Sequence, residues 1–130
     1  MSRPVIEVVA ALVVGPDGRV LVVRKRGTTP FMNPGGKPEP GETHVEALCR
    51  ELHEELGLVV DVDVLTSLGT FRTDAANEAG HELVAHTFRL PLTDGTHAVA
   101  AEIEEARWID PSAPGVPLAP LAENFLLPLA

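Results

Sequence analysis

The chain has 130 residues, of which 45% are hydrophobic and 22% are charged. This length and balance fit one folded domain over residues 1–130 and exclude a disordered tail. Nineteen Asp and Glu against ten Lys and Arg give a formal charge of −9, which makes long nucleic acids and anionic membrane surfaces poor partners. A small phosphorylated ligand remains compatible with this charge, because carboxylates that hold a divalent cation reverse the local electrostatics.

The first predicted elements form a β-hairpin. Residues 5–14 are rich in β-branched side chains and precede Gly15-Pro16-Asp17-Gly18, a run typical of a turn, and residues 20–24 resume as a second strand. The apolar run 8–14 is too short to cross a bilayer, and it lacks the cleavage pattern of a signal peptide. Cys49 is the only cysteine, which excludes an internal disulfide. We therefore expect a cytoplasmic protein.

A long loop and a helix follow the hairpin. Residues 27–42 contain four Gly and four Pro, too many breakers for a regular element, so they predict a long shaped loop of the kind that is usually functional. Thr43 and Glu46 form a capping-box pattern. Apolar residues then recur at spacings of three and four until Gly57 supplies a stop: Val45, Leu48, Leu52 and Leu56. The pattern predicts a helix over residues 43–56.

The second half of the chain is predicted to contain strands and a closing helix. Val alternates with Asp over residues 58–64, which predicts a strand with one exposed face. Runs at 67–72 and 82–90 predict a hairpin around a mobile polar loop, 73–80. A short strand is expected at 105–109 and a helix at 118–127. This order predicts an α/β fold in which helices pack on a mixed β-sheet.

The predicted helix has a second, acidic face. Glu51, Glu54 and Glu55 stand at i, i+3 and i+4 and share one side of the helix. Like charges at these spacings oppose the helix by about 0.2–0.5 kcal/mol per pair, and the helix dipole disfavours anions in the last turn. A bound Mg²⁺ or Mn²⁺ would reverse these penalties, since hard cations take carboxylate oxygens. The alternative is a merely solvated acidic face.

The spacing around this face carries a motif. Gly36 is followed after five residues by Glu42, after seven more by Arg50, and then by Glu-Leu-His-Glu-Glu-Leu-Gly-Leu over residues 51–58. Every defined position of this string resembles the Nudix box. The resemblance implies the Nudix fold, a mixed β-sheet sandwiched between α-helices. It also implies a metal-dependent hydrolase that cleaves a diphosphate bond in a nucleoside diphosphate derivative.

The resemblance implies metal ligands within the box. Glu54 and Glu55 match the main ligands, with Mg²⁺ or Mn²⁺ as the expected cofactor. Glu51 matches a further ligand or the base that activates water, and Gly35 would offer its backbone carbonyl oxygen.

Other roles are implied around this set. Arg50 would orient a glutamate through its guanidinium fork, and Glu42 would support the site. Some family members take the base from a glutamate before a late strand, for which Glu102 is our first candidate and Glu105 our second. Plain surface charge is the alternative for both. Glu102 is also a candidate metal ligand.

Four further residues are candidates for substrate binding. Lys37, in the loop, and Arg24 and Arg26, at the end of the second strand, could contact a phosphate. Asn33 could hydrogen-bond a base or sugar edge, or it could simply shape the loop.

The expected substrate is a small phosphorylated nucleotide. The small size resembles the nucleoside triphosphate pyrophosphatase type, including members that remove oxidised nucleotides. Hydrolysis of ADP-ribose, nucleotide sugars or dinucleoside polyphosphates stays open, and so does a non-catalytic nucleotide-binding module on the same fold. An exposed sheet edge would also allow a homodimer.

Overall fold

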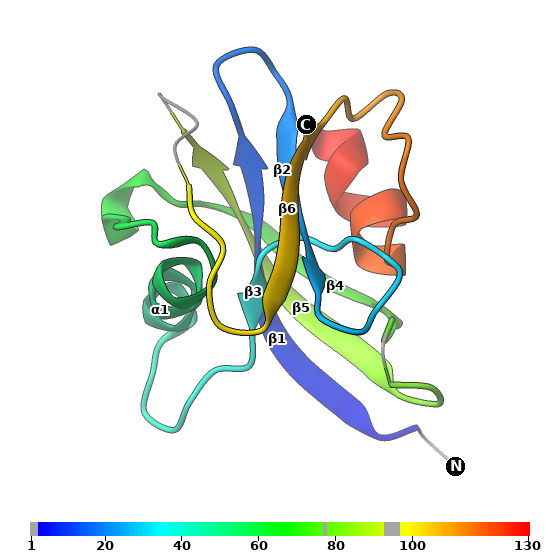
Figure 1. Ribbon diagram of the computed structural model, residues 1–130. Helices are drawn as coiled ribbons and strands as arrows, with labels where there is room; N and C mark the ends of the chain where they lie inside the picture. Colours follow the sequence, from blue (N-terminus) through cyan, green and yellow to red (C-terminus); the bar gives the residue numbers. More distant parts are fainter. Residues whose placement is uncertain (1–2, 77, 93–96) are drawn as a thin grey trace.

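A six-stranded mixed sheet forms the centre of the fold (Figure 1), with five strands in the order β4-β5-β1-β2-β6 and the short β3 paired with β1. The structure is a computed structural model that describes residues 3–76, 78–92 and 97–130. β1 and β5 run parallel, whereas the other pairs are antiparallel. The strands are β1 (Val5–Val14), β2 (Val20–Lys25), β3 (Gly35–Gly36), β4 (Thr66–Asp74), β5 (Glu82–Pro91) and β6 (Ile103–Ile109).

The predicted first hairpin is present, but its two strands separate soon after the turn. β1 and β2 pair only at Val13↔Leu21 and Val14↔Val20. β2 pairs with β6 on its other edge along its whole length, and farther from the turn β1 pairs instead with β3 through Val9 and Ala10. The sheet is therefore split between β1 and β2, and the two glycines of β3, from the predicted loop 27–42, lie beside β1 at this split.

The helix α1 (His44–Leu56) confirms the prediction for residues 43–56. The Thr43 side chain accepts a hydrogen bond from Glu46 N, and the Glu46 carboxylate accepts one from Thr43 N, so the capping box is complete. At the other end, Gly57 adopts a left-handed conformation with φ of 68°, which glycine does without a steric penalty. Local signals therefore set both ends of α1.

Two hydrophobic cores lie on opposite faces of the sheet. Side chains alternate between the faces of a strand, and β1 contributes to both cores. One set of β1 residues packs under α1, and the alternate set packs under the C-terminal helical segment, which Figure 1 shows on the other side of the sheet. The first set is Val9, Ala11 and Val13; the second is Ala10, Leu12 and Val14. The predicted α/β sandwich is confirmed.

Residues 58–64 do not form the predicted strand. The segment is irregular up to a 3₁₀ helix, η1 (Val62–Val64), and Val59 is 92% exposed. The Asp61 carboxylate accepts a hydrogen bond from Asp63 N at 3.0 Å, a local turn that competes with strand pairing. The strand prediction is wrong here.

The closing helix begins later than predicted and is not an α-helix of the expected length. Residues 118–119 instead pair with the loop: Leu118 bridges to Phe31, and Ala119 N donates to Phe31 O. A π-helical turn, η2 (Ala122–Leu126), and a 3₁₀ turn, η3 (Leu127–Leu129), follow. The predicted start at residue 118 is wrong because this backbone is already hydrogen-bonded to the loop.

The remaining strands follow the predictions closely. β4 and β5 form the expected hairpin, and β6 begins two residues earlier than predicted. Asn77, within the loop predicted at 73–80, lies outside the described residues. Across the described ranges, no helix is both long and apolar enough to cross a membrane.

Candidate functional site

A cavity of about 480 Å³ lies where β1, β3 and α1 meet. This volume is in the range of small-molecule sites. The charged part of its lining comes from β2, the loop, α1, the residue before β6, and Asp74 and Glu78 at the end of β4 and in the segment that follows it; the apolar part comes mainly from β1, β5 and residues 119–121. The charged part includes Lys25, Lys37, Glu39, Arg50, Glu51, Glu54 and Glu102, and the apolar part includes Ile6, Val8, Ala10, Leu83 and Leu121.

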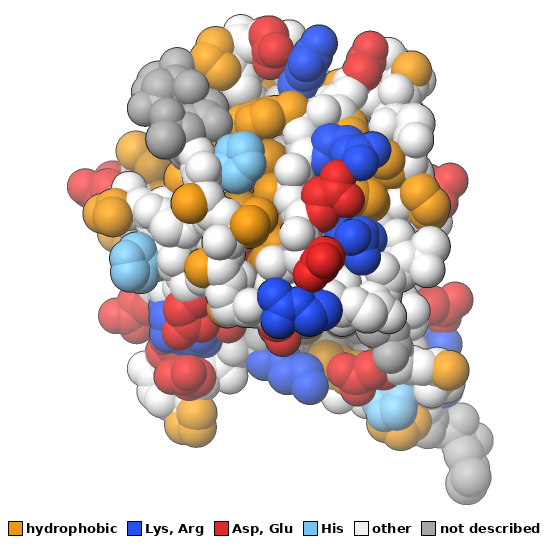
Figure 2. Space-filling model, viewed as in Figure 1, with side chains coloured by type: hydrophobic (Ala, Val, Ile, Leu, Met, Phe, Trp, Pro, Cys, Tyr) orange, Lys and Arg blue, Asp and Glu red, His pale blue; other side chains and the backbone are white. Residues whose placement is uncertain are grey.

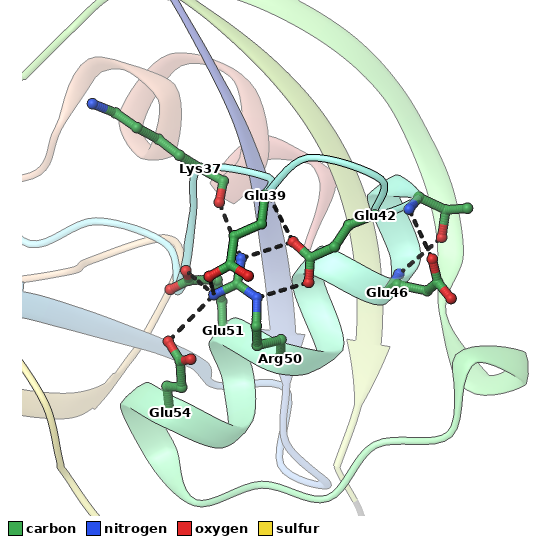
Figure 3. A network of polar contacts seen from close by, with 8 residues as sticks. Lys37, Glu39, Glu42, Glu46, Arg50, Glu51 and Glu54 are labelled. Carbon is green, nitrogen blue, oxygen red and sulfur yellow. Dashed lines mark hydrogen bonds and ion pairs between the residues drawn. The ribbon is translucent and has the colours of Figure 1, made fainter.

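Arg50 is the centre of the polar network at the charged part (Figure 3). Its Nε and Nη2 donate to the two carboxylate oxygens of Glu42 at 2.7 and 2.9 Å. Its Nη1 donates to Glu51 at 2.8 Å and to Glu54 at 3.3 Å. Nη2 also donates to the carbonyl oxygen of Lys37 at 3.1 Å. The planar fork therefore ties the loop to the acidic face of α1.

This network shifts the pKa values of Glu42 and Arg50. The hydrogen bond from Arg50, followed by one from Glu39 N, lowers the pKa of Glu42 below its ordinary value. The same contacts, with Glu42 first, raise the pKa of Arg50. Glu42 and Arg50 therefore both stay charged across the physiological range.

Glu55 lies beneath the cavity, between α1 and β3. It is 2% exposed, and its Oε1 accepts a hydrogen bond from Gly35 N at 3.1 Å. Burial raises the pKa of Glu55 to about 8, and burial likewise raises the pKa of Glu51. Both carboxyls have thus been removed from water without enough positive charge nearby to offset the loss.

Two glycines allow the loop to approach these carboxylates. A Cβ on Gly36 would lie 2.5 Å from Cδ of Glu51, and a Cβ on Gly35 would overlap the carbonyl oxygen of Val9. Only a residue without a side chain lets the backbone come this close. The Glu51 carboxylate therefore lies directly against the peptide of Gly36.

The donor set of this face fits a hard divalent cation. Glu51 and Glu54 line the cavity, Gly35 lines it beside them, and Glu55 lies below. Carboxylate and carbonyl oxygens suit Mg²⁺ or Mn²⁺. A cation here would also offset the charge that burial leaves uncompensated on Glu51 and Glu55.

The structure brings most of the predicted site residues together. Glu102 lines the cavity, and its Oε1 lies 3.4 Å from Nζ of Lys25. Lys37 also lines it, with Nζ 3.7 Å from Glu78. Asn33 is 6% exposed and lines the same cavity, yet neither its Oδ1 nor its Nδ2 has a hydrogen-bond partner among the described residues. A buried amide without partners is unfavourable, so a ligand that reached these two atoms would satisfy them.

Arg24 and Arg26 lie away from the cavity lining. Arg24 donates to the carbonyl oxygen of Thr28 at 3.0 Å and pairs with Glu105 at 3.6 Å, and Arg26 donates to Glu104 at 3.1 Å. Figure 2 shows acidic and basic side chains alternating along the face where β6 lies in Figure 1. Both arginines are engaged in ion pairs with β6.

Sequence reasoning missed Lys25. Leu21 and Val23 belong to the core under α1, and alternation along β2 places Lys25 on that same face. The alternation of side chains along β2 could therefore have predicted that Lys25 lies on the face of α1. The apolar part of the cavity could not be predicted in this way, because its residues come from separate segments: β1, β5 and the C-terminal segment.

Comparisons with known proteins agree with this geometry. The family model of the NUDIX domain matches residues 5–126. A MutT-like protein from Streptomyces ambofaciens is 33% identical over 79% of this chain and 62% of its own length, so the chain spans less than two thirds of that relative. CTP pyrophosphohydrolase from Escherichia coli strain K12 is 34% identical over 93% of this chain and 91% of its own. The crystal structure of a MutT NUDIX hydrolase from Burkholderia pseudomallei has a TM-score of 0.79 and 26% identity, covering 95% of this chain and 96% of that one.

Proposed function

This chain belongs to the NUDIX family, and we propose that it is a divalent-metal-dependent pyrophosphohydrolase of nucleoside triphosphates. The observation that carries the proposal is a single cavity whose lining is charged in one part and apolar in the other. Its charged part holds Glu51 and Glu54 above the buried Glu55, and its apolar part comes mainly from β1, β5 and residues 119–121. Asn33, whose amide is unpaired among the described residues, also lines the cavity. A diphosphate suits the first part and a nucleoside suits the second.

Glu51, Glu54, Glu55 and the carbonyl oxygen of Gly35 would hold Mg²⁺ or Mn²⁺. When bound, such ions neutralise phosphate charge and acidify a water molecule. Arg50 acts as a positioning residue, because its hydrogen bonds fix the directions of Glu51 and Glu54. Misplaced carboxylates would lose the alignment on which rate depends.

Two carboxylates are candidates for the general base. Glu51 lies against Gly36 and is held by Arg50. Glu102 is more exposed and lies near Lys25. Either could accept the proton of the attacking water. A matched pair of variants, Glu51→Gln and Glu102→Gln, distinguishes them, because loss of the base also removes the acidic limb of the pH–rate profile.

Phosphate contacts fall to the lysines of the cavity. Lys25 and Lys37 line it, whereas Arg24 and Arg26 lie away from the lining. Ammonium groups at these positions favour the phosphate chain by Coulomb attraction. We therefore assign the predicted phosphate-binding role to Lys25 and Lys37.

Asn33 would recognise the base. Its amide offers both a donor and an acceptor, which matches the mixed donor and acceptor edge of a nucleobase, while Val8, Leu83 and Leu121 provide apolar contact. The likeness to the CTP pyrophosphohydrolase of Escherichia coli, aligned over 91% of that protein's length, also supports a nucleoside triphosphate.

A substrate panel tests the proposal. The chain is assayed with Mg²⁺ or Mn²⁺ for release of phosphate and pyrophosphate from nucleoside triphosphates, oxidised nucleotides, ADP-ribose, nucleotide sugars and dinucleoside polyphosphates. We expect the highest kcat/KM for a nucleoside triphosphate, with pyrophosphate as product. A higher value for ADP-ribose or a dinucleoside polyphosphate would reassign the substrate. Absence of turnover across the panel would indicate a nucleotide-binding module.

Two variants test the metal assignment. Glu54→Gln removes one carboxylate from the cavity and should abolish most turnover while the protein stays folded, because Glu54 is exposed. Glu123→Gln, on the exposed side of the C-terminal segment, removes the same charge elsewhere and should retain the parental rate. A parental rate for Glu54→Gln would contradict the assignment.

A further inference from the structure

Three metal-ligating side chains meet outside the cavity. Glu7 on β1, His86 on β5 and His44, the first residue of α1, each place one ligand atom within 4.8 Å of the other two. None of the three lines the cavity. β1 and β5 are parallel neighbours with Val9 opposite His86, and alternation places Glu7 and His86 on the face that α1 covers.

His86 is held in a fixed orientation with one nitrogen unsatisfied. Its Nδ1 and the hydroxyl of Thr70 are 3.0 Å apart and share a hydrogen bond. Its Nε2 is shielded from solvent and has no hydrogen-bond partner within the described part of the chain, although Oε2 of Glu7 lies 3.2 Å away. A shielded imidazole nitrogen beside a carboxylate, without a hydrogen bond between them, is a place where a cation is favourable.

His44 provides the third group. Its ring stacks on that of His86, with centroids 3.7 Å apart and planes 14° apart. Imidazole nitrogen is a common ligand of transition-metal ions. His44 is exposed, so its ring is free to tilt toward an ion beside Nε2 of His86. The carboxylate of Glu7 offsets the positive end of the α1 dipole, which alone would oppose a cation.

We propose that Glu7, His44 and His86 form a binding site for a divalent transition-metal ion of the zinc class, with Thr70 holding the His86 ring in position. Two imidazole nitrogens and one carboxylate oxygen suit Zn²⁺ or Co²⁺ and discriminate against Mg²⁺. The ion would join the first residue of α1 to β1 and β5. It would thereby brace the helix that carries Glu51, Glu54 and Glu55. This site is independent of the proposed hydrolysis.

The test measures Zn²⁺ binding to the full chain, prepared without a polyhistidine tag and stripped of metal. A chromophoric chelator competes for Zn²⁺ in excess Mg²⁺, which occupies the carboxylate face. We expect one Zn²⁺ per chain, and visible absorption typical of nitrogen ligation when Co²⁺ replaces it. Thr70→Val should weaken binding about tenfold or more, and His44→Ala should weaken it further and remove the Co²⁺ signature.

Two controls separate this site from the rest of the chain. His53→Ala removes an exposed histidine of the same helix that is outside the cluster, and it should keep the parental affinity. Glu54→Gln should also keep it, because Glu54 belongs to the cavity. The proposal is overturned if the parent binds no Zn²⁺ in excess Mg²⁺, if His44→Ala and Thr70→Val bind as tightly as the parent, or if Glu54→Gln abolishes binding.

Discussion

Replacing Gly36 by Ala tests how tightly the Glu51 carboxylate is held. The added Cβ would lie 2.5 Å from Cδ and 2.6 and 2.7 Å from the two carboxylate oxygens. Since carbon atoms in contact are about 3.5 Å apart, the carboxylate must retreat by about 1 Å. A displacement of this size in a catalytic group lowers the rate by about 10²-fold, equivalent to about 2.7 kcal/mol in the activation free energy.

The same substitution should leave the fold intact. Gly36 does not have a positive φ, so Ala adds no backbone strain, and the displaced atoms are the end of a flexible side chain. Denaturant unfolding should therefore show a loss of less than about 1 kcal/mol, while steady-state hydrolysis in saturating Mg²⁺ falls about 10²-fold.

A double variant shows whether the effect passes through Glu51. If it does, Gly36→Ala combined with Glu51→Gln should be no slower than Glu51→Gln alone. A parental rate for Gly36→Ala, or losses that add in the double variant, would refute the reasoning.

Three further predictions concern stability. Leu52 is fully buried between α1 and the sheet, so Leu52→Ala should lower the free energy of unfolding by about 2–5 kcal/mol in urea, whereas Leu52→Met should lower it by less than about 1.5 kcal/mol; equal losses would contradict the packing. Arg50 lowers the pKa of Glu42, so the stability that Glu42 contributes is present above its ordinary pKa and is lost as the pH falls through the lowered value. The unfolding free energies of the parent and Glu42→Gln should therefore differ at neutral pH and converge in acid, and a constant difference would be inconsistent with this pairing. Mg²⁺ at about 100 times its Kd should stabilise the parent by about 2.7 kcal/mol but stabilise Glu54→Gln less, as measured by thermal unfolding at several Mg²⁺ concentrations.

The parts of the fold that were predictable carry their signals locally. Thr43, Glu46 and Gly57 mark the ends of α1 within the helix itself, and the bonds that they make are the ones that the pattern implies. The alternation of Val and Asp over residues 58–64 misled because an aspartate that caps a 3₁₀ turn produces the same pattern as a strand with one wet face.

The parts that were not predictable depend on segments far apart in the sequence. The parallel pairing of β1 with β5 and the bridge from Phe31 to Leu118 have no local pattern. The same holds for the burial of Asn33, which depends on how the loop packs into the fold. Lys25 differs, since the alternation of side chains along β2 was sufficient to place it on the face that α1 covers.

The split between β1 and β2 has a consequence for how this molecule can diversify. Because the sheet parts there, the cavity takes walls from both of its faces: Glu51 and Glu54 from the side of α1, and Leu83 and Leu121 from the other side. Each wall rests on a different hydrophobic core. Substitutions on the side of Leu83 and Leu121 change the packing of the C-terminal segment but not the core under α1. The part of the cavity proposed for the nucleoside and the part proposed for the metal can thus change in sequence separately within one domain.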